Sequence, residues 1–315
     1  MITFLTSPKP FTGIASIQQT KAIRNWQGLG DNVEVILYGD SPRTAAACRE
    51  LGIRHVPDIK ATEQGIPYFE AIAAHAAEHA SYDIQVYLNC DILLTSHILK
   101  AIKRIPFADF LMIGQRIDLK EGVEVDAAGI GNPEQLMMLA DAGLISLHTP
   151  GGSDYFAFRR GMWTDLPPVV IGRGGYDNAL IAYCLQRHIP VIDSTLTVPA
   201  LHQFHDYGHA AGGADEVFKG DDAKRNLAFV PLDAIPVLED SCYLLRGNEL
   251  SQIRCRGDLL RFLFMKYRYR NVPLLPGILR NLWRLQTKIG LRHWWDPTLQ
   301  EVLASYQELP QEKLS

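Results

Sequence analysis

Short apolar, β-branched runs alternate with helix-like segments over the first two-thirds of this chain, and this alternation restricts the fold more than any other feature. The strand-like runs lie at Ile2–Thr6, Val33–Tyr38, 53–56, Ile84–Leu88, 110–117, 155–158 and Val191–Asp193. The segments with helical spacing lie at 17–26, 41–51, 68–80, 95–104 and 177–188. A β-α-β-α order predicts an α/β fold with a mostly parallel, Rossmann-like sheet flanked by helices.

Charge divides the chain into an acidic part and a basic part. Residues 1–237 carry 19 Lys and Arg against 27 Asp and Glu, a net charge of −8, whereas residues 238–315 carry 12 against 8, a net charge of +4. We therefore expect one α/β domain over 1–237 and a basic, aromatic-rich, helical appendage over 238–315. An acidic body repels phosphates, so nucleic acid is not an expected partner.

Cysteine usage and the N-terminal sequence indicate the compartment. The five cysteines are scattered without CxxC spacing, which argues against a disulfide framework and suits a reducing environment. The first residues lack the basic segment of a secretory signal, and no run approaches the ~20 apolar residues that span a bilayer. We expect a cytoplasmic protein.

The segment Asn89-Cys90-Asp91 carries the most informative chemistry. It directly follows an apolar strand, so it lies at the carboxyl edge of the predicted sheet, where open α/β sheets bind ligands. Residues i and i+2 of an extended chain point to the same side, so Asn89 and Asp91 can face one ion together. Mg²⁺ or Mn²⁺ on such oxygen ligands would stabilise a diphosphate leaving group. For the tripeptide alone, a strand end with turn-forming Asn and Asp is an equal alternative.

Three further charged residues are candidates for catalysis. Arg116 ends a predicted strand at the same edge, where a guanidinium suits a diphosphate or a sugar hydroxyl, or forms a salt bridge with Asp118. Asp154 precedes an aromatic strand, and Asp177 begins an apolar helix. Either carboxylate can accept the proton of an attacking hydroxyl, and Asp177 is the better candidate. The alternative for Asp177 is a carboxylate that the helix dipole favours.

Seven sequence blocks extend this pattern over residues 1–210. They are TSPKPF (6–11), ILYGD (36–40), YLNCDILL (87–94), IGQRIDL (113–119), GSDYFAF (152–158), GRGGYDNALI (172–181) and LHQFHDYGH (201–209). In these blocks and their order the chain resembles the GT-A glycosyltransferases, in particular a bacterial and plant group of nucleotide-diphospho-sugar transferases. The resemblance implies a GT-A-like fold and a metal-dependent glycosyltransferase.

The resemblance also implies a set of metal ligands. The family's D-x-D-type motif binds the metal and the nucleotide sugar, and here Asn89 occupies its first acidic position, which leaves Asp91 as the stronger ligand. A histidine after the catalytic region often completes the metal shell in these enzymes, and this chain has three within eight residues, at His202, His205 and His209. His202 or His205 is the candidate, with Mn²⁺ or Mg²⁺ as the ion. Zn²⁺ is less expected, because no cysteine lies at a fitting spacing.

Contacts to the nucleobase and ribose are implied for residues that follow the first two strands. These residues are Thr6, Ser7 and Pro8 after the first strand, and Gly39 and Asp40 after the second. For Asp40, a turn that caps the following helix is an equal alternative, because Gly-Asp-Ser-Pro is a turn-forming sequence.

The appendage contains a basic stretch interleaved with aromatic residues. Residues 254–292 hold ten Lys and Arg against one acidic residue, and the aromatic side chains continue to Trp295. Basic, amphipathic helices bind anionic membrane surfaces. The stretch 254–295 is therefore interpreted either as a contact with the inner-membrane surface, which implies a peripheral location, or as an appendage that packs its aromatic residues on the body.

The expected activity is transfer of a sugar from a nucleoside-diphosphate sugar to an acceptor hydroxyl. Uridine is the family's usual base, and the acceptor is an unknown glycan or lipid-linked molecule. A catalytically silent carbohydrate-binding or membrane-docking subunit is one alternative, which Asn89 keeps open. A sugar-1-phosphate nucleotidyltransferase is another, but it needs a Gly-rich, basic loop after the first strand, and TSPKPFTG matches that poorly.

Overall fold

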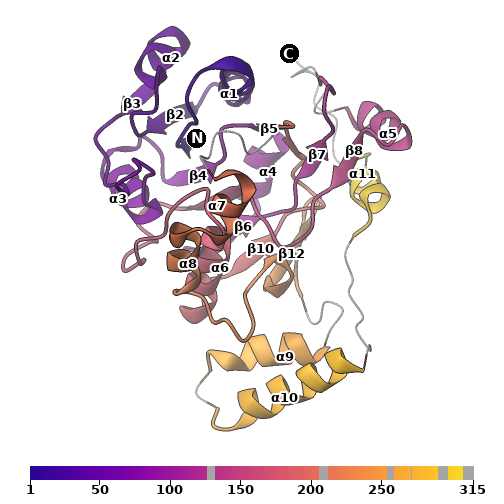
Figure 1. The fold of residues 1–315 in the computed structure, drawn as a ribbon. Helices are drawn as coiled ribbons and strands as arrows, with labels where there is room; N and C mark the ends of the chain where they lie inside the picture. Colours follow the sequence, from indigo (N-terminus) through magenta and orange to yellow (C-terminus); the bar gives the residue numbers. More distant parts are fainter. Residues whose placement is uncertain (126–131, 206–211, 254–258, 271, 290–296, 308–315) are drawn as a thin grey trace.

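The computed structural model describes residues 1–125, 132–205, 212–253, 259–270, 272–289 and 297–307. A large α/β body makes up most of the molecule, and a pair of helices extends from one end of it (Figure 1). The chain then returns to the body, where α11 (Leu299–Gln307) packs beside α5 (Pro133–Asp141).

The body is built on a nine-stranded sheet with the order β13-β12-β10-β6-β9-β4-β1-β2-β3. Its strands are β1 Ile2–Thr6, β2 Val33–Tyr38, β3 Arg54–Val56, β4 Ile84–Leu88, β6 Leu111–Ile113, β9 Tyr155–Arg159, β10 Val191–Asp193, β12 Tyr243–Arg246 and β13 Glu249–Gln252. Five of the eight neighbouring pairs are parallel, and the pairs that contain β9, together with the β12–β13 hairpin, are antiparallel. The predicted α/β class with a mostly parallel sheet is confirmed.

Helices cover both faces of this sheet. They are α1 Gly13–Gln27, α2 Thr44–Leu51, α3 Phe69–His79, α4 His97–Lys103, α6 Tyr176–Gln186, α7 Gly213–Lys219 and α8 Asp221–Leu227. Successive strand residues alternate between two cores: Phe4 packs with α1 and α4 on one face, and Leu5 packs with α3 and α6 on the other. Burial on both faces explains why the central strands are continuously apolar.

A second, four-stranded sheet with the order β5-β11-β7-β8 lies against the first core. Its strands are β5 Ile92–Leu94, β11 Ala200–His202, β7 Ile117–Leu119 and β8 Ile145–Leu147. The sequence did not predict this sheet. The single strand expected over 110–117 is wrong, because the chain leaves the main sheet after β6 and joins the small sheet at β7. The histidine-containing block LHQFHDYGH begins within β11, and α7 starts at Gly213.

Gly114 marks the point at which the chain changes sheets. A Cβ atom there would collide with the Tyr155 hydroxyl and would lie 3.1 Å from the backbone nitrogen of Thr195. The hydroxyl is fixed in that place by its hydrogen bond of 2.9 Å with Ser194 Oγ. Only glycine therefore allows the close packing that separates β6 from β7.

The region beyond residue 238 is not helical to its end, which corrects the expectation from the sequence. β12 extends the main sheet by parallel pairing with β10, and β13 forms a hairpin with it. In α11, Ser305 Oγ donates to the carbonyl of Leu196 at 3.0 Å and Tyr306 Oη donates to that of Thr195 at 2.8 Å. These segments belong to the body, and the extension consists of α9 (Leu259–Arg268) and α10 (Leu275–Lys288).

Among the described residues, no helix combines the length and the apolar character that crossing a bilayer requires.

Replacing Gly114 by alanine is expected to lower the free energy of unfolding by about 1–3 kcal/mol, the usual cost of forcing an extra carbon into a packed interior. Chemical denaturation followed by circular dichroism measures the change. Adding Tyr155→Phe should recover part of the loss, because it removes the hydroxyl that the new carbon meets. A double variant that is as unstable as the sum of the two single variants would contradict this explanation.

Candidate active site

A cleft of about 1020 Å³ opens at the carboxyl ends of β1, β2 and β4. Its lining includes Ser7, Pro8, Lys9, Gly39, Asp40, Asn89, Asp91, Arg116, His148, Asp154, Tyr176, Asp177, His202 and His205. This is the edge at which open α/β sheets bind ligands. Most of the polar residues that the sequence analysis selected therefore share one cavity.

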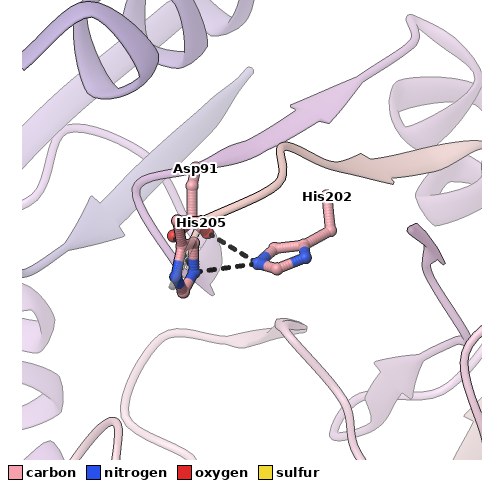
Figure 2. Close-up of side chains that lie close together, drawn as sticks. All are labelled: Asp91, His202 and His205. Atoms are coloured by element: carbon pink, nitrogen blue, oxygen red, sulfur yellow. Dashed lines mark hydrogen bonds and ion pairs between the residues drawn. The ribbon is translucent and has the colours of Figure 1, made fainter. Parts of the chain in front are cut away.

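Strand pairing in the small sheet brings Asp91 and His202 together. Asp91 directly precedes β5, and the next residue, Ile92, pairs with His202 in antiparallel β11. The backbone N–H of Gln203 donates to the Asp91 carbonyl at 3.2 Å, which continues the pairing past the strand ends. His205 follows three residues after His202, so both imidazoles return to the same carboxylate (Figure 2).

Asp91, His202 and His205 each offer one ligand atom, and these atoms lie within 4.8 Å of one another. The two Nε2 atoms of the histidines are 3.1 Å apart. From Asp91, Oδ2 lies 3.2 Å from His205 Nε2, and Oδ1 lies 3.8 Å from His202 Nε2. Oδ1 is buried and accepts no hydrogen bond among the described residues. A buried carboxylate oxygen without a donor is costly, and a cation would satisfy it.

Asp118 orients His202 through the ring nitrogen Nδ1, which points away from Asp91. β7 and β11 are parallel neighbours, and their register places Asp118 beside His202, with Oδ1 3.1 Å from the histidine Nδ1. Burial lowers the pKa of His202 more than the nearby carboxylate raises it, so the ring is neutral. Because a carboxylate only accepts, Nδ1 carries the proton and Nε2 presents a lone pair to Asp91 and His205.

Asp118 is also the partner of two other side chains. His148 Nδ1 and Arg116 Nε both lie 2.7 Å from its carboxylate oxygens. Burial opposes its ionisation, but the hydrogen bonds with His148 and His202 and the charge of Arg116 hold the pKa of Asp118 below its usual range. The carboxylate is therefore charged at neutral pH, and the tautomer of His202 is fixed.

Lys9 places a cation at the open side of the cluster. Its ammonium nitrogen lies 2.9 Å from Asp91 Oδ2 and 2.9 Å from His205 Nε2. An ammonium group only donates, so in this contact the single lone pair of His205 Nε2 accepts from Lys9. Burial opposes the charge of Asp91, but the charge of the adjacent Lys9 ammonium holds the pKa of Asp91 well below its usual range.

These contacts fit a divalent cation. The two imidazole Nε2 atoms lie 3.1 Å apart beside a charged carboxylate whose Oδ1 accepts no hydrogen bond among the described residues. Such an arrangement of acceptors is repulsive unless a cation lies among them. Lys9 supplies a single charge at the edge of the group, and Asp91, His202 and His205 are the residues that would hold a metal ion.

Arg116 connects the cluster with the Asn-x-Asp motif. Its guanidinium bridges Asp118 and Asp154, and Asp154 also accepts a hydrogen bond from the Asn89 side chain. The pairing of β4 with β9 accounts for this contact, because Asn89 and Asp154 follow and precede the paired residues Leu88 and Tyr155. Asn89 engages Asp154 and, at 3.5 Å, the Tyr176 hydroxyl. Its role as a metal ligand stays a prediction.

Asp177 lies at the start of α6, on the wall of the cleft. The N–H of Ser153 donates to its Oδ2 at 3.2 Å. Burial raises the pKa of Asp177 to about 6, although backbone N–H groups of Asn178, Ser153 and Asp177 itself and the charge of Arg116 act in the opposite direction. A carboxylate of this kind can hold or release a proton near neutral pH.

The residues expected at the nucleotide end do not all face the cleft. Ser7, Pro8, Gly39 and Asp40 line it, whereas the side chain of Thr6 is fully buried in β1 and does not. The chain turns at Gly39 with a φ of 93°, a conformation that favours glycine.

Lys9, His148 and the orienting function of Asp118 were not predicted from the sequence. Lys9 stands inside the block TSPKPF and was a detectable signal. His209 and Asp206, beside the predicted histidine ligands, lie outside the described residues.

No protein-family model and no curated protein matches the chain. Solved structures of glucosyl-3-phosphoglycerate synthase from Mycobacterium tuberculosis are similar to it. The complex with Mg²⁺ and UDP is 16% identical, with a TM-score of 0.43, over 73% of this chain and 77% of that one. The complex with Mn²⁺, UDP and phosphoglyceric acid is 16% identical, with a TM-score of 0.43, over 73% and 76%.

Mn²⁺ binding, measured from the loss of the free-ion signal in electron paramagnetic resonance, tests the cluster. Asp118→Asn is expected to weaken binding about 10–100-fold, because His202 loses the group that orients it. Lys9→Met should tighten binding roughly fivefold, because the ion no longer has to displace a partly buried ion pair.

Lys103→Met, an exposed substitution in α4, is the matched control and should leave the affinity unchanged. An Asp118→Asn variant that binds Mn²⁺ as tightly as the native chain would show that Asp118 does not orient a metal ligand.

Proposed function

We propose that this chain is a glycosyltransferase that transfers a sugar from a nucleoside-diphosphate sugar, with UDP as the leaving group, to an acceptor hydroxyl. The observation that carries the proposal is the cluster of Asp91, His202 and His205 in a large cleft at the carboxyl edge of the sheet. The sequence blocks that resemble GT-A glycosyltransferases contain all three residues.

Mn²⁺ is the proposed ion, in preference to Mg²⁺. Mg²⁺ prefers an octahedral set of oxygen ligands, whereas two imidazoles and one carboxylate suit a softer divalent ion. When bound, the ion would neutralise the charge that develops on the diphosphate as the glycosidic bond breaks. The carboxylate of Asp91 and the Nε2 atoms of His202 and His205 would hold it.

The remaining polar residues are assigned by their place in the cleft. Ser7, Pro8, Gly39 and Asp40, which follow β1 and β2, are proposed to contact the nucleoside. Arg116 has carboxylate partners on two sides, so we assign it to positioning: it holds Asp118 against His202 and Asp154 against Asn89. This assignment replaces a direct contact between Arg116 and the diphosphate as its main role.

Asp177 is the proposed general base. It lies on the cleft wall, and burial raises its pKa to about 6, close to the value that best serves proton transfer at neutral pH. Asp154 is less suited, because Arg116 and Asn89 already occupy its two oxygens. Ionised Asp177 would take the proton of the attacking hydroxyl, and the acceptor would bind beside it.

The proposal predicts metal-dependent release of nucleoside diphosphate from a panel of UDP-sugars, measured by chromatography with Mn²⁺ and with excess chelator. Turnover should occur only with Mn²⁺ and should be lost in Asp91→Asn, whereas Asp31→Asn, an exposed control, should behave as the native chain. Release of pyrophosphate would instead identify a nucleotidyltransferase. Metal-dependent binding of donors without release would identify a silent binding subunit.

Asp177→Asn is expected to change activity and stability in opposite directions. Turnover should fall about 10²–10⁴-fold, because the variant cannot accept a proton. The folded-state pKa lies above the ordinary value of 3.8, so the native chain loses stability as pH rises through about 6, and a neutral side chain avoids this loss. Denaturation at pH 8 should show a gain of about 1–3 kcal/mol.

The gain should shrink as the pH falls toward 4, where Asp177 is protonated in the folded chain. Asp165→Asn, at an exposed position, is the control for both measurements. A variant that is less stable than the native chain at pH 8 would assign Asp177 to stabilising the start of α6 instead.

A further inference from the structure

The outermost helix, α10, presents a continuous apolar stripe to solvent. The stripe consists of Leu274, Ile278, Leu282, Leu285 and Ile289, each of them exposed, with Leu274 at 83%. The spacing of four, four, three and four residues puts all five side chains on one face of the helix. Large exposed patches of this kind mark interaction sites, because soluble surfaces rarely keep them.

The opposite side of the pair α9–α10 holds it to the body. Phe264, Met265 and Leu279 form a small core with Ala234. Arg268 and Arg280 both pair with Asp233, at 2.6 and 3.2 Å. The stripe is consequently on the side of α10 that these contacts leave uncovered, and α9 lies between α10 and the body (Figure 1).

The Lys and Arg residues of α9 and α10 also form two groups, one that contacts the body and one that is exposed to solvent. Residues 259–288 contain seven Lys and Arg and no Asp or Glu. Three of the seven, Arg261, Arg268 and Arg280, pair with aspartates of the body. The other four are exposed: Lys266, Arg270, Arg284 and Lys288. The exposed charge of this module is entirely positive, and Arg284 and Lys288 stand beside the apolar stripe on α10.

We propose that the α10 stripe docks on the surface of an anionic lipid bilayer. Five aliphatic side chains on one face would enter the boundary between headgroups and acyl chains, and the exposed cations would contact lipid phosphates. A second copy of this chain fits less well, because pairing two stripes would bring eight exposed cations together without an acidic residue from either helix. The inference is independent of the proposed glycosyl transfer.

Co-sedimentation with vesicles tests this docking. The native chain should pellet with phosphatidylcholine vesicles that contain phosphatidylglycerol, and much less with phosphatidylcholine alone. Leu282→Glu with Leu285→Glu should weaken binding at least tenfold. Ile14→Glu with Ile17→Glu replaces two residues of α1 that are each 70% exposed, and this matched control should bind as the native chain does.

Arg284→Gln with Lys288→Gln should reduce the preference for anionic vesicles and the sensitivity to salt. All the substituted side chains are exposed, so each variant should fold as the native chain does. Thermal melting checks this. Absence of binding to anionic vesicles at low salt, or equal loss in the α1 and α10 variants, would overturn the proposal. A native dimer in light scattering that Leu282→Glu with Leu285→Glu dissociates, without vesicle binding, would assign the stripe to self-association.

Discussion

The antiparallel pairing of β5 with β11 is the contact on which the site depends. It joins segments more than a hundred residues apart and places the carboxylate of Asp91 beside His202. Both strands have three residues, so the pairing is stabilised mainly by its surroundings: Trp26 donates to the Ile92 carbonyl at 2.8 Å, and Asn25 bonds to Leu94 in both directions. The first long helix, α1, thus secures the strand that directly follows Asp91.

A network of charged side chains continues from the β5–β11 pair along the cleft. Asp118, Arg116 and Asp154 alternate in sign, and each is held by at least two partners. Such a network fixes side-chain positions before a ligand arrives, which is what electrostatic stabilisation of a transferring group requires. Asp177 forms no ion pair within the part of the chain that the structure describes, and its burial raises its pKa instead.

Much of the fold could be predicted because the central strands are continuously apolar and the helices between them have clear periodicity. The position of Asp91 at the sheet edge could be predicted for the same reason, since residues 89–91 directly follow β4. The small sheet could not be predicted, because three-residue strands carry no periodicity and their register depends on contacts between distant segments. Asp118 was therefore considered only as a salt-bridge partner of Arg116, although its register position beside His202 defines its role.

The C-terminal region also contains features that local sequence patterns could not predict. Its basic and aromatic composition suggested helices throughout, but β12 is selected by the open edge of β10, a feature of the assembled sheet. The inward arginines of α9 and α10 are separated from the outward ones only by the positions of Asp233 and Asp240 in the body. No local pattern distinguishes the two groups.

Anomalous scattering from crystals grown with Mn²⁺ and UDP tests the central claim most directly. We expect a manganese peak in contact with Asp91 and the Nε2 atoms of His202 and His205, with the Lys9 ammonium moved away from Asp91. UDP bound in the cleft without any manganese peak at these three residues, and with Lys9 still bonded to Asp91, would contradict it.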